Sequence, residues 1–430
     1  MRKLLIISIL AASAAVVGKA QVNYRDYPNP EFARMIDENP AMACLNACPY
    51  DLAVQPGADT KAPRGYRPVY ISHYGRHGTR SGWDQERYEL ILNALNKAKE
   101  EGILSAEGDS LLRETALVKD ATNKMDGRLT LRGQREHRAI AQRMYERFPR
   151  VFRRGSHNVR VLSSEVPRCI ISMASFTNEL SAINPKLHIV MDCGSEIQKE
   201  VSNGAAPETR DARRRISDSL WHAVQPDTTA LLNTLFTDAE AAKGIVKDAK
   251  RLSQAIFAVG RISRSFDYDF NVFRHLDFGT VYAWSDYNNV YMYTGQCNSL
   301  EFGERRMKQC EPLVGNIVRL ADDALESGKV SADLRFGHDF PLLALASYLG
   351  LEGVGDKLSA DEVVASGWWG FFDVPFASNL QIIFYRNKKD DVIVKFLYNE
   401  KETMVRGLES VDGPYYSWNT IKANLEGYRR

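Results

Sequence analysis

An apolar run that leads into a charged turn, and then into a helical pattern, is the feature that most constrains this chain. Residues Val69–Tyr74 have the character of a buried strand, and apolar side chains recur at helical spacing over residues 83–99. The turn between them, Arg76–Arg80, places a histidine and a glycine between two arginines. A strand, a short turn and a helix in this order are the building unit of an α/β fold.

Alternation of strand and helix patterns continues along much of the chain. Further strands are predicted over residues 158–164, 187–191, 332–336, 380–385 and 392–398. The first three stand beside helical patterns, which favours a mainly parallel sheet with helices on both faces. The last two flank a polar turn and predict a β-hairpin at the sheet edge. Thr130 precedes the helical pattern of residues 132–148 and is its predicted N-cap.

One long stretch shows helical patterns only. Residues 205–294 therefore predict an all-helical insertion, a cap domain that packs over the mouth of the sheet. The α/β core then comprises residues 66–204 and 295–430. Residues 21–65 are rich in proline, asparagine and aspartate without a sustained period, so we expect an extended arm that wraps the core.

The N-terminus has the pattern of a secretory signal peptide over residues 1–20. Arg2 and Lys3 form the charged start, residues 4–17 the apolar middle, and small residues precede Gln21. The pattern predicts export to a periplasm or beyond, with an uncleaved anchor as the alternative. Cleavage removes three cations and no acid, which takes the formal charge from +2 to −1. A near-neutral protein has no global field that would attract nucleic acid or an acidic membrane surface.

The six cysteines of the chain fit an oxidising compartment. By position, Cys44 with Cys48 and Cys297 with Cys310 are candidates for local disulfides, although the pairing stays open. Cys169 falls on an apolar helical face and predicts a buried thiol. No histidine stands near these cysteines at ligand spacing, which argues against a metal site.

Charged groups stand at or near three predicted strand ends. They are Arg76, His77, Arg80, Arg168, His338 and Asp339. Ligands of an open α/β sheet bind outside the carboxyl ends of the strands, so we expect these six residues to meet there. Guanidinium groups fork onto phosphate oxygens and a neutral imidazole is a nucleophile, so the set suits hydrolysis of a phosphate monoester. Taken alone, Arg168 would more often be an ordinary surface arginine, and His338 a structural histidine.

Gly78, beside the histidine of the turn, has no Cβ. The sequence therefore predicts strained backbone angles or a close approach to a ligand at this position. The helix that follows the turn would add the positive end of its dipole to an anion site.

At these residues the chain resembles the histidine acid phosphatases, in the branch that includes phytases and multiple inositol polyphosphate phosphatases. The resemblance rests on Tyr74–Arg80, on Leu129–Gly133, on Ser163–Arg168 with Ser164 in place of a threonine, and on His338–Asp339. It runs from about Tyr66 to the end of the chain. It implies a Rossmann-like α/β core with a helical cap domain, in agreement with the pattern of strands and helices.

The resemblance also implies a role for each residue of the set. His77 would be the nucleophile that takes the phosphoryl group. The phosphate would be held by Arg76, Arg80, Arg168 and His338. Asp339 would protonate the leaving alkoxide and then act as base toward water, with its pKa raised by the anionic phosphate and an acidic optimum. The partner would be a small phosphate monoester, and no metal or other cofactor would be needed.

Two departures from the family pattern leave the substrate open. The turn ends Arg80-Ser81-Gly82 where the family often has Arg-x-Pro, and Asp339 stands where many multiple inositol polyphosphate phosphatases have the alanine of His-Ala-Glu. Phytate or another inositol phosphate is the leading substrate, and a sugar or aryl phosphate is the alternative. A phosphomutase and a periplasmic binding protein without catalysis are further alternatives, and the oligomeric state is open.

The predicted cap contains lysines that could bind extra phosphates of phytate. They are Lys243, Lys247 and Lys250. A solvated helix face is the commoner explanation of such a group.

Overall fold

The computed structural model describes residues 22–83, 85–202, 210–220 and 224–427. The predicted signal peptide lies outside these residues. Within the described ranges, no helix combines the length and the apolar character needed to cross a membrane.

The described strands form one eight-stranded sheet in the order β3-β2-β4-β1-β5-β6-β7, with β8 also paired to β6. Their bounds are β1 Arg67–Arg76, β2 Asn158–Ser163, β3 His188–Asp192, β4 Ala332–Gly337, β5 Asn379–Arg386, β6 Val392–Tyr398, β7 Lys401–Thr403 and β8 Tyr415–Ser417. Strands β3, β2, β4 and β1 run parallel, and the remaining pairings are antiparallel. The predicted hairpin β5–β6 is confirmed, but β5 pairs with β1, so the hairpin continues the sheet and the short β7 and β8 lie at its edge.

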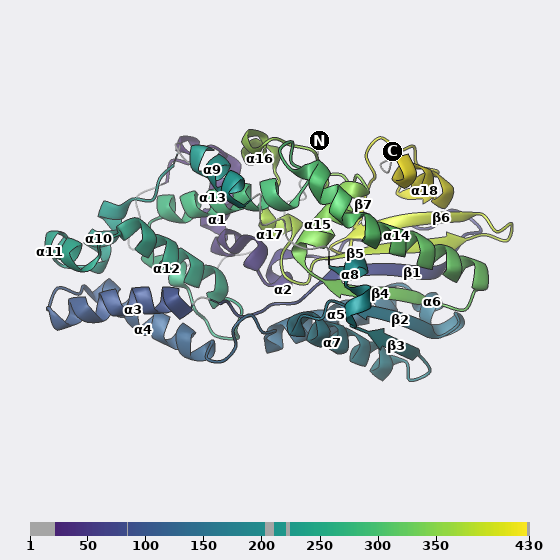
Figure 1. Ribbon diagram of the computed structural model, residues 1–430, viewed down its shortest axis with the longest axis horizontal. Helices are drawn as coiled ribbons and strands as arrows, with labels where there is room; N and C mark the ends of the chain where they lie inside the picture. The colour runs from purple at the N-terminus through teal and green to yellow at the C-terminus, as the bar shows by residue number, and fades with distance from the viewer. Residues whose placement is uncertain (1–21, 84, 203–209, 221–223, 428–430) are drawn as a thin grey trace.

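Helices cover both faces of the sheet, as predicted (Figure 1). One face carries α14 (Gly303–Ser327), α15 (Asp339–Tyr348) and α18 (Trp418–Gly427), and the other carries α5 (Leu131–Arg147), α6 (Pro149–Arg154) and α7 (Pro167–Ile183). Alternation along the strands explains the two layers. Tyr70 and Tyr74 of β1 join the core under α14, whereas Ile71 joins the core under α5 and α7. Thr130 caps α5 as predicted, because its side chain accepts the Gly133 N–H.

A third core lies in a helical lobe beside the sheet (Figure 1). Its helices include α3 Gln85–Glu100, α4 Ala106–Ala121, α9 Arg210–Leu220, α10 Thr228–Leu235, α11 Ala239–Ile245, α12 Ala249–Ser263 and α13 Phe278–Gln296. The lobe draws on more of the chain than residues 205–294, because α3 and α4 pack against α12 and α10. Helical periodicity locates these helices in the sequence, but it does not say which core each one joins.

The expectation of an extended arm was wrong for residues 24–53, which are largely helical, whereas residues 54–63 have neither helix nor strand. The helical segments are short: η1 Tyr24–Asp26, α1 Pro30–Glu38, η2 Pro40–Ala47 and α2 Tyr50–Ala53. The Asn29 side chain caps α1 by accepting the Phe32 N–H, and Pro30 occupies its first turn. That asparagine–proline pair is a helix start signal that can be read in the sequence. Phe32 and Ile36 of α1 are buried in the core of the helical lobe.

All six cysteines are free thiols, so neither of the expected local disulfides is formed. Cys44, Cys48, Cys297 and Cys310 are buried, and burial raises the pKa of each thiol. The reactive thiolate is therefore disfavoured at these positions, which act as small apolar side chains of the core. Spacing alone does not distinguish such cysteines from a bonded pair.

The remaining elements are short. They are η3 Ser195–Ile197, α8 Gln198–Val201, η5 Val272–His275, α16 Ala360–Ser366 and α17 Gly370–Asp373.

Candidate active site

The candidate site forms where β1 and β4 end side by side. The His77 N–H donates to the Gly337 carbonyl, and the Ala377 N–H from the loop before β5 donates to the His77 carbonyl. His77 is thus held on both sides by main-chain bonds from neighbouring elements. The loop also places the Phe376 ring beside the imidazole, with ring centroids 5.9 Å apart.

The imidazole of His77 is buried and held in one tautomer. Its Nδ1 lies 2.9 Å from the Gly78 carbonyl oxygen, which can only accept, so Nδ1 carries the proton and Nε2 carries the lone pair. Burial lowers the pKa of His77 well below its usual range, and the nearby cations Arg76, Arg168 and Arg80 lower it further. The ring is therefore neutral, with a nucleophilic Nε2.

Arg76 is almost fully enclosed at the end of β1. Its Nη1 donates to the carbonyl oxygens of Asn46 and Val374 at 2.6 and 2.7 Å, and its Nη2 lies 3.1 Å from Asp339 Oδ2. The guanidinium also lies over the Phe376 ring, 4.7 Å from its centroid. These contacts fix the position of a cation that could not easily be held in a buried site without partners.

Arg80 and Arg168 lie against the same indole. The guanidinium carbon of Arg80 is 3.8 Å from the ring centroid of Trp83, and that of Arg168 is 5.2 Å from it. Arg80 Nη1 also donates to the Ser81 carbonyl at 2.8 Å. Contact with an aromatic face offsets part of the cost of holding two like charges close together.

His338 follows β4 and packs between the phosphate-binding candidates and the sheet. Arg168 Nη2 lies 3.3 Å from His338 Nδ1 and can only donate, so Nδ1 accepts and Nε2–H faces the Ser164 hydroxyl at 3.1 Å. Burial and Arg168 lower the pKa of His338 to about 4. The ring stacks on Phe340 and lies 5.6 Å from the His77 ring, between centroids.

Asp339 is the first residue of α15. Its Oδ2 lies 3.1 Å from Arg76 Nη2 and 3.1 Å from Asn46 Nδ2, and its Oδ1 accepts the Phe340 N–H at 3.0 Å. Burial raises the pKa of Asp339, but Arg76, His338 and the Asn46 hydrogen bond together outweigh burial and lower it. The protein's own groups thus favour the carboxylate, and a raised pKa requires the negative charge of a bound phosphate.

The glycine of the turn has a different role from the one predicted. Gly78 does not have a positive φ, but a Cβ added there would lie 2.5 Å from the Gly133 carbonyl oxygen. A Cβ on Gly133 would in turn lie 2.3 Å from the Thr79 carbonyl oxygen. The two glycines therefore let the N-terminus of α5 approach the turn closely. Thr130 completes the contact, since its N–H and hydroxyl both donate to the Thr79 carbonyl.

Glu136 of α5 binds the turn Arg76–Arg80 through hydrogen bonds. It accepts the Thr79 N–H at 2.8 Å, the Thr79 hydroxyl at 2.6 Å and the Tyr50 N–H at 2.8 Å. Burial raises the pKa of this carboxyl to about 7. Glu136 thus joins the turn Arg76–Arg80 to the N-terminal arm.

A cavity of about 300 Å³ opens over the site. It is lined by Asn46, Ala47, Arg76, Arg80, Trp83, Arg87, Ala258, Arg261, Ile262 and Phe376. Arg87 lies on α3 and Arg261 on α12, so the helical lobe adds two cations opposite the strand ends. The three cap lysines do not line this cavity, and Lys243 pairs instead with Glu240 on its own helix.

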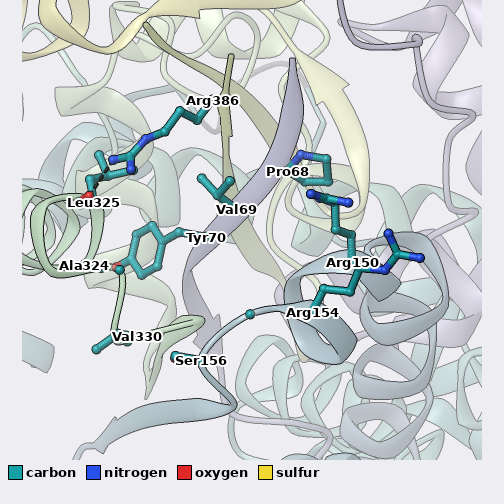
Figure 2. A pocket seen from close by; sticks show the side chains of 12 residues that line it. Pro68, Val69, Tyr70, Arg150, Arg154, Ser156, Ala324, Leu325, Val330 and Arg386 are labelled. Atoms are coloured by element: carbon teal, nitrogen blue, oxygen red, sulfur yellow. Dashed lines mark hydrogen bonds between the residues drawn. The ribbon is translucent and has the colours of Figure 1, made fainter. Parts of the chain in front are cut away.

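A second cavity lies at the other end of β1 (Figure 2). Arg150, Arg154 and Arg386 all line it, but Arg386 donates to the Leu325 carbonyl at 2.5 Å and is directed away from the other two. The three arginines of this second cavity therefore do not point toward one centre, unlike the arginines near His77. Among the described residues, no group of histidine, cysteine or acidic side chains is arranged to hold a metal ion.

Sequence comparisons with known proteins find nothing: no family model and no curated protein matches the chain. Solved structures match its fold. The multiple inositol polyphosphate phosphatase of Bifidobacterium longum, in complex with inositol hexasulfate, gives a TM-score of 0.73 at 17% identity, over 89% of this chain and 97% of that one. The chain has the histidine acid phosphatase fold.

Two phytases share this histidine acid phosphatase fold. The phytase from D. castellii gives a TM-score of 0.63 at 14% identity, over 90% of this chain and 85% of that one. The phytase from Citrobacter braakii gives 0.53 at 13% identity, over 85% and 98%. At these identities the likeness concerns the fold.

Within the histidine acid phosphatase fold, the six residues predicted from the sequence lie around one centre. Arg76 contacts Asp339, Arg168 contacts His338, and Arg80 shares the Trp83 ring with Arg168. Five further residues at the site were not predicted from the sequence: Asn46, Trp83, Arg87, Glu136 and Arg261. Trp83 and Glu136 stand near motifs that were recognised. Arg87 lies in the helix predicted directly after the turn. Asn46 and Arg261 are placed by packing between segments far apart in the chain, for which the sequence holds no local signal.

Proposed function

We propose that this protein is a secreted phosphatase that hydrolyses phosphate monoesters through a phosphohistidine on His77. The observation that carries the proposal is the state of His77, a buried neutral imidazole with its lone pair on Nε2 and with the cations Arg76, Arg80 and Arg168 near the ring. Those cations would neutralise the charge on the phosphoryl oxygens, and such stabilisation is usually the largest catalytic contribution. Buried Nε atoms of Arg76 and Arg168 have no hydrogen-bond partner among the described residues, which suits an anion site.

In the first step, His77 Nε2 attacks phosphorus, and a P–N bond forms as the ester P–O bond breaks. The electron pair of that bond leaves with the alcohol oxygen, which takes a proton from Asp339. The Gly78 carbonyl accepts from Nδ1–H and stabilises the positive imidazolium of the intermediate.

In the second step, water attacks the phosphohistidine. Asp339, now a carboxylate, takes a proton from the water as the new P–O bond forms and the P–N bond breaks. Inorganic phosphate and neutral His77 are regenerated. The lowered pKa of Asp339 suits this second step, whereas the first step depends on the phosphate dianion to bring the proton onto the carboxyl.

Inositol polyphosphates are the substrates that we propose. Arg87 and Arg261 stand across the cavity from the strand ends, so phosphates other than the reacting one would meet cations of the helical lobe. The fold neighbour from B. longum is a multiple inositol polyphosphate phosphatase in complex with inositol hexasulfate, which agrees with this choice.

Phosphate release tests the proposal, with phytate and an aryl phosphate compared between about pH 4 and 7 in the presence of a chelator. We expect turnover of both, with kcat/KM higher for phytate. Turnover of the aryl ester alone would indicate a general acid phosphatase. Saturable phosphate binding with no release from either ester would contradict the proposal and favour a binding protein.

Export rests on the N-terminal pattern of residues 1–20. N-terminal sequencing of the protein recovered outside the cytoplasm should begin at Gln21. An N-terminus at Met1 in that fraction would contradict cleavage.

A further inference from the structure

We propose that Asn46, from the N-terminal arm, is a positioning residue that holds one oxygen of Asp339 as an acceptor and leaves the other to carry the catalytic proton. The use of that proton rests on the proposed phosphatase function. The placement of Asn46 itself rests on hydrogen bonds that join the arm, the helical lobe and α15.

The orientation of the Asn46 amide is fixed by a neighbour that can only donate. Arg261 Nη2 lies 2.5 Å from Asn46 Oδ1, and a guanidinium has no acceptor. The NH₂ of Asn46 must therefore face the other way, where Nδ2 lies 3.1 Å from Asp339 Oδ2. Arg261 Nε also donates to the Cys44 carbonyl at 3.1 Å, so α12 holds both the amide and the main chain of the arm.

The main chain around Asn46 is held in an unusual conformation. Leu45 has φ 51° and ψ −126°, which a residue with a branched side chain rarely adopts. The Leu45 side chain is buried, and the Asn46 carbonyl accepts Arg76 Nη1 at 2.6 Å. Strain of this kind persists only where the surroundings determine the conformation, and it clusters at functional sites.

The two oxygens of Asp339 are not equivalent. Oδ2 meets two groups that only donate toward it, Arg76 Nη2 and Asn46 Nδ2, each at 3.1 Å. Oδ1 meets one main-chain donor, Phe340 N–H, at 3.0 Å. A proton on Oδ2 would face two donors, so protonation occurs at Oδ1.

Charged groups approach Asp339 from each element packed around it. They are Arg76 at the end of β1, Arg80 in the turn after it, Arg168 on α7 and His338 before α15. These groups are set by the strand ends and stay in place when Asn46 changes. Asn46 is the uncharged side-chain donor to Asp339, and its removal alters the carboxyl directly. Asn46→Ala also removes the acceptor for Arg261, which Asn46→Asp retains.

Two substitutions distinguish positioning from general packing. Asn46→Ala removes the donor to Oδ2, so the pKa of Asp339 should rise by about one unit, because a hydrogen bond to the charged form favours that form. Asn46→Asp keeps an acceptor for Arg261 but places a second carboxylate beside Oδ2, and should raise the pKa of Asp339 further. Asn184→Ala is the control, since that buried amide donates to the Phe152 carbonyl, far from α15 in sequence.

The experiment is a carbon-13 NMR titration of the Asp339 carboxyl in the full chain, assigned with Asp339→Asn, beside rates for an alkyl and an aryl phosphate. We expect the pKa of Asp339 to be highest in Asn46→Asp and lower in Asn46→Ala. It should be lowest in the wild type and in Asn184→Ala, with equal values in these two proteins. The alkyl rate of Asn46→Ala should fall about tenfold more than its aryl rate, because the proton is no longer confined to Oδ1 and alkyl esters depend on its transfer to the leaving oxygen.

The NMR titration decides the placement of Asn46 even if the chain turns over neither ester. An Asp339 pKa unchanged in both Asn46 variants would overturn the inference. An equal loss of alkyl and aryl turnover would overturn the catalytic part of it. Absence of turnover in the wild type would overturn the proposed function, while a shifted pKa would still support the role of Asn46 toward Asp339.

Discussion

The floor and the roof of the candidate site are built in different ways. The floor consists of strand ends and the turns directly after them, with His77, Arg76 and Asp339 held by main-chain bonds of the sheet and of α15. The roof consists of Asn46 from the arm, with Arg87 and Arg261 from the helical lobe. The floor can be recognised from short stretches of sequence, whereas the roof depends on the packing of distant helices. We expect the floor to set the reaction and the roof to set the substrate.

Removal of His77, the proposed nucleophile, should have the largest effect on the floor of the site. His77→Ala should lower kcat by at least about 10⁴-fold for every phosphate ester, because the nucleophile and its covalent route are lost. Phosphate release with phytate and an aryl phosphate measures the effect. The circular dichroism spectrum should be unchanged, and residual activity near the wild-type rate would place the chemistry elsewhere.

Loss of Asp339, the proposed acid, should slow esters with poor leaving groups more than esters with good ones. Asp339→Asn should slow alkyl phosphates by roughly 10² to 10⁴-fold, the range of general acid catalysis, and aryl phosphates much less in the step that forms phosphohistidine. Single-turnover kinetics with the two ester classes separate that step from hydrolysis of the intermediate. Equal losses in the first step for both classes would exclude Asp339 as the acid.

Glu136 links the floor of the site to the N-terminal arm, so its protonation should change the free energy of unfolding. Because its pKa rises from an unfolded value near 4.3 to about 7, the proton binds more tightly in the folded state. This contribution is complete below about pH 4 and is lost as the pH rises through 7, at most about 4 kcal/mol. Urea unfolding at several pH values should show the decline in the wild type and a smaller one in Glu136→Gln. If the free energy of unfolding depends on pH equally in the two proteins, the decline does not come from Glu136.

The smallest effect is expected at the roof. Arg261→Met should raise KM for phytate about tenfold, as for the loss of one charge-assisted contact, and change KM for an aryl phosphate little. Lys243→Met is the matched control, because Lys243 is a lobe cation that pairs with Glu240 and does not line the cavity. If the Arg261 and Lys243 variants behave alike toward phytate, the roof does not select the substrate.

The difference between floor and roof also explains which features could be predicted from the sequence. Apolar strand runs, helical spacing and the Thr130 cap are local features, so the mainly parallel core of the sheet and its flanking helices were predicted correctly. Charged residues after strand ends were expected together because parallel strands share one carboxyl edge. Arg76 and Asp339, far apart in sequence, accordingly form an ion pair.

Other features depended on contacts that no local pattern encodes. The helices of the arm were missed although Asn29 and Pro30 mark the start of one of them. Gly78 is required by its approach to Gly133 on α5, which only the fold reveals. The two candidate disulfides are not formed. Their prediction was wrong because buried free thiols can have the same spacing in the sequence as bonded cysteines.

Chemical identification of the covalent intermediate tests the central claim most directly. Asp339→Asn incubated with an aryl phosphate should accumulate phosphoenzyme, because a good leaving group needs no acid while hydrolysis of the intermediate lacks its base. Mass spectrometry after an alkaline quench should place the phosphoryl group on Nε2 of His77, since Nδ1 is bonded to the Gly78 carbonyl. Phosphorylation of another residue or of Nδ1, or turnover in the wild type with no phosphoenzyme under any condition, would contradict the account.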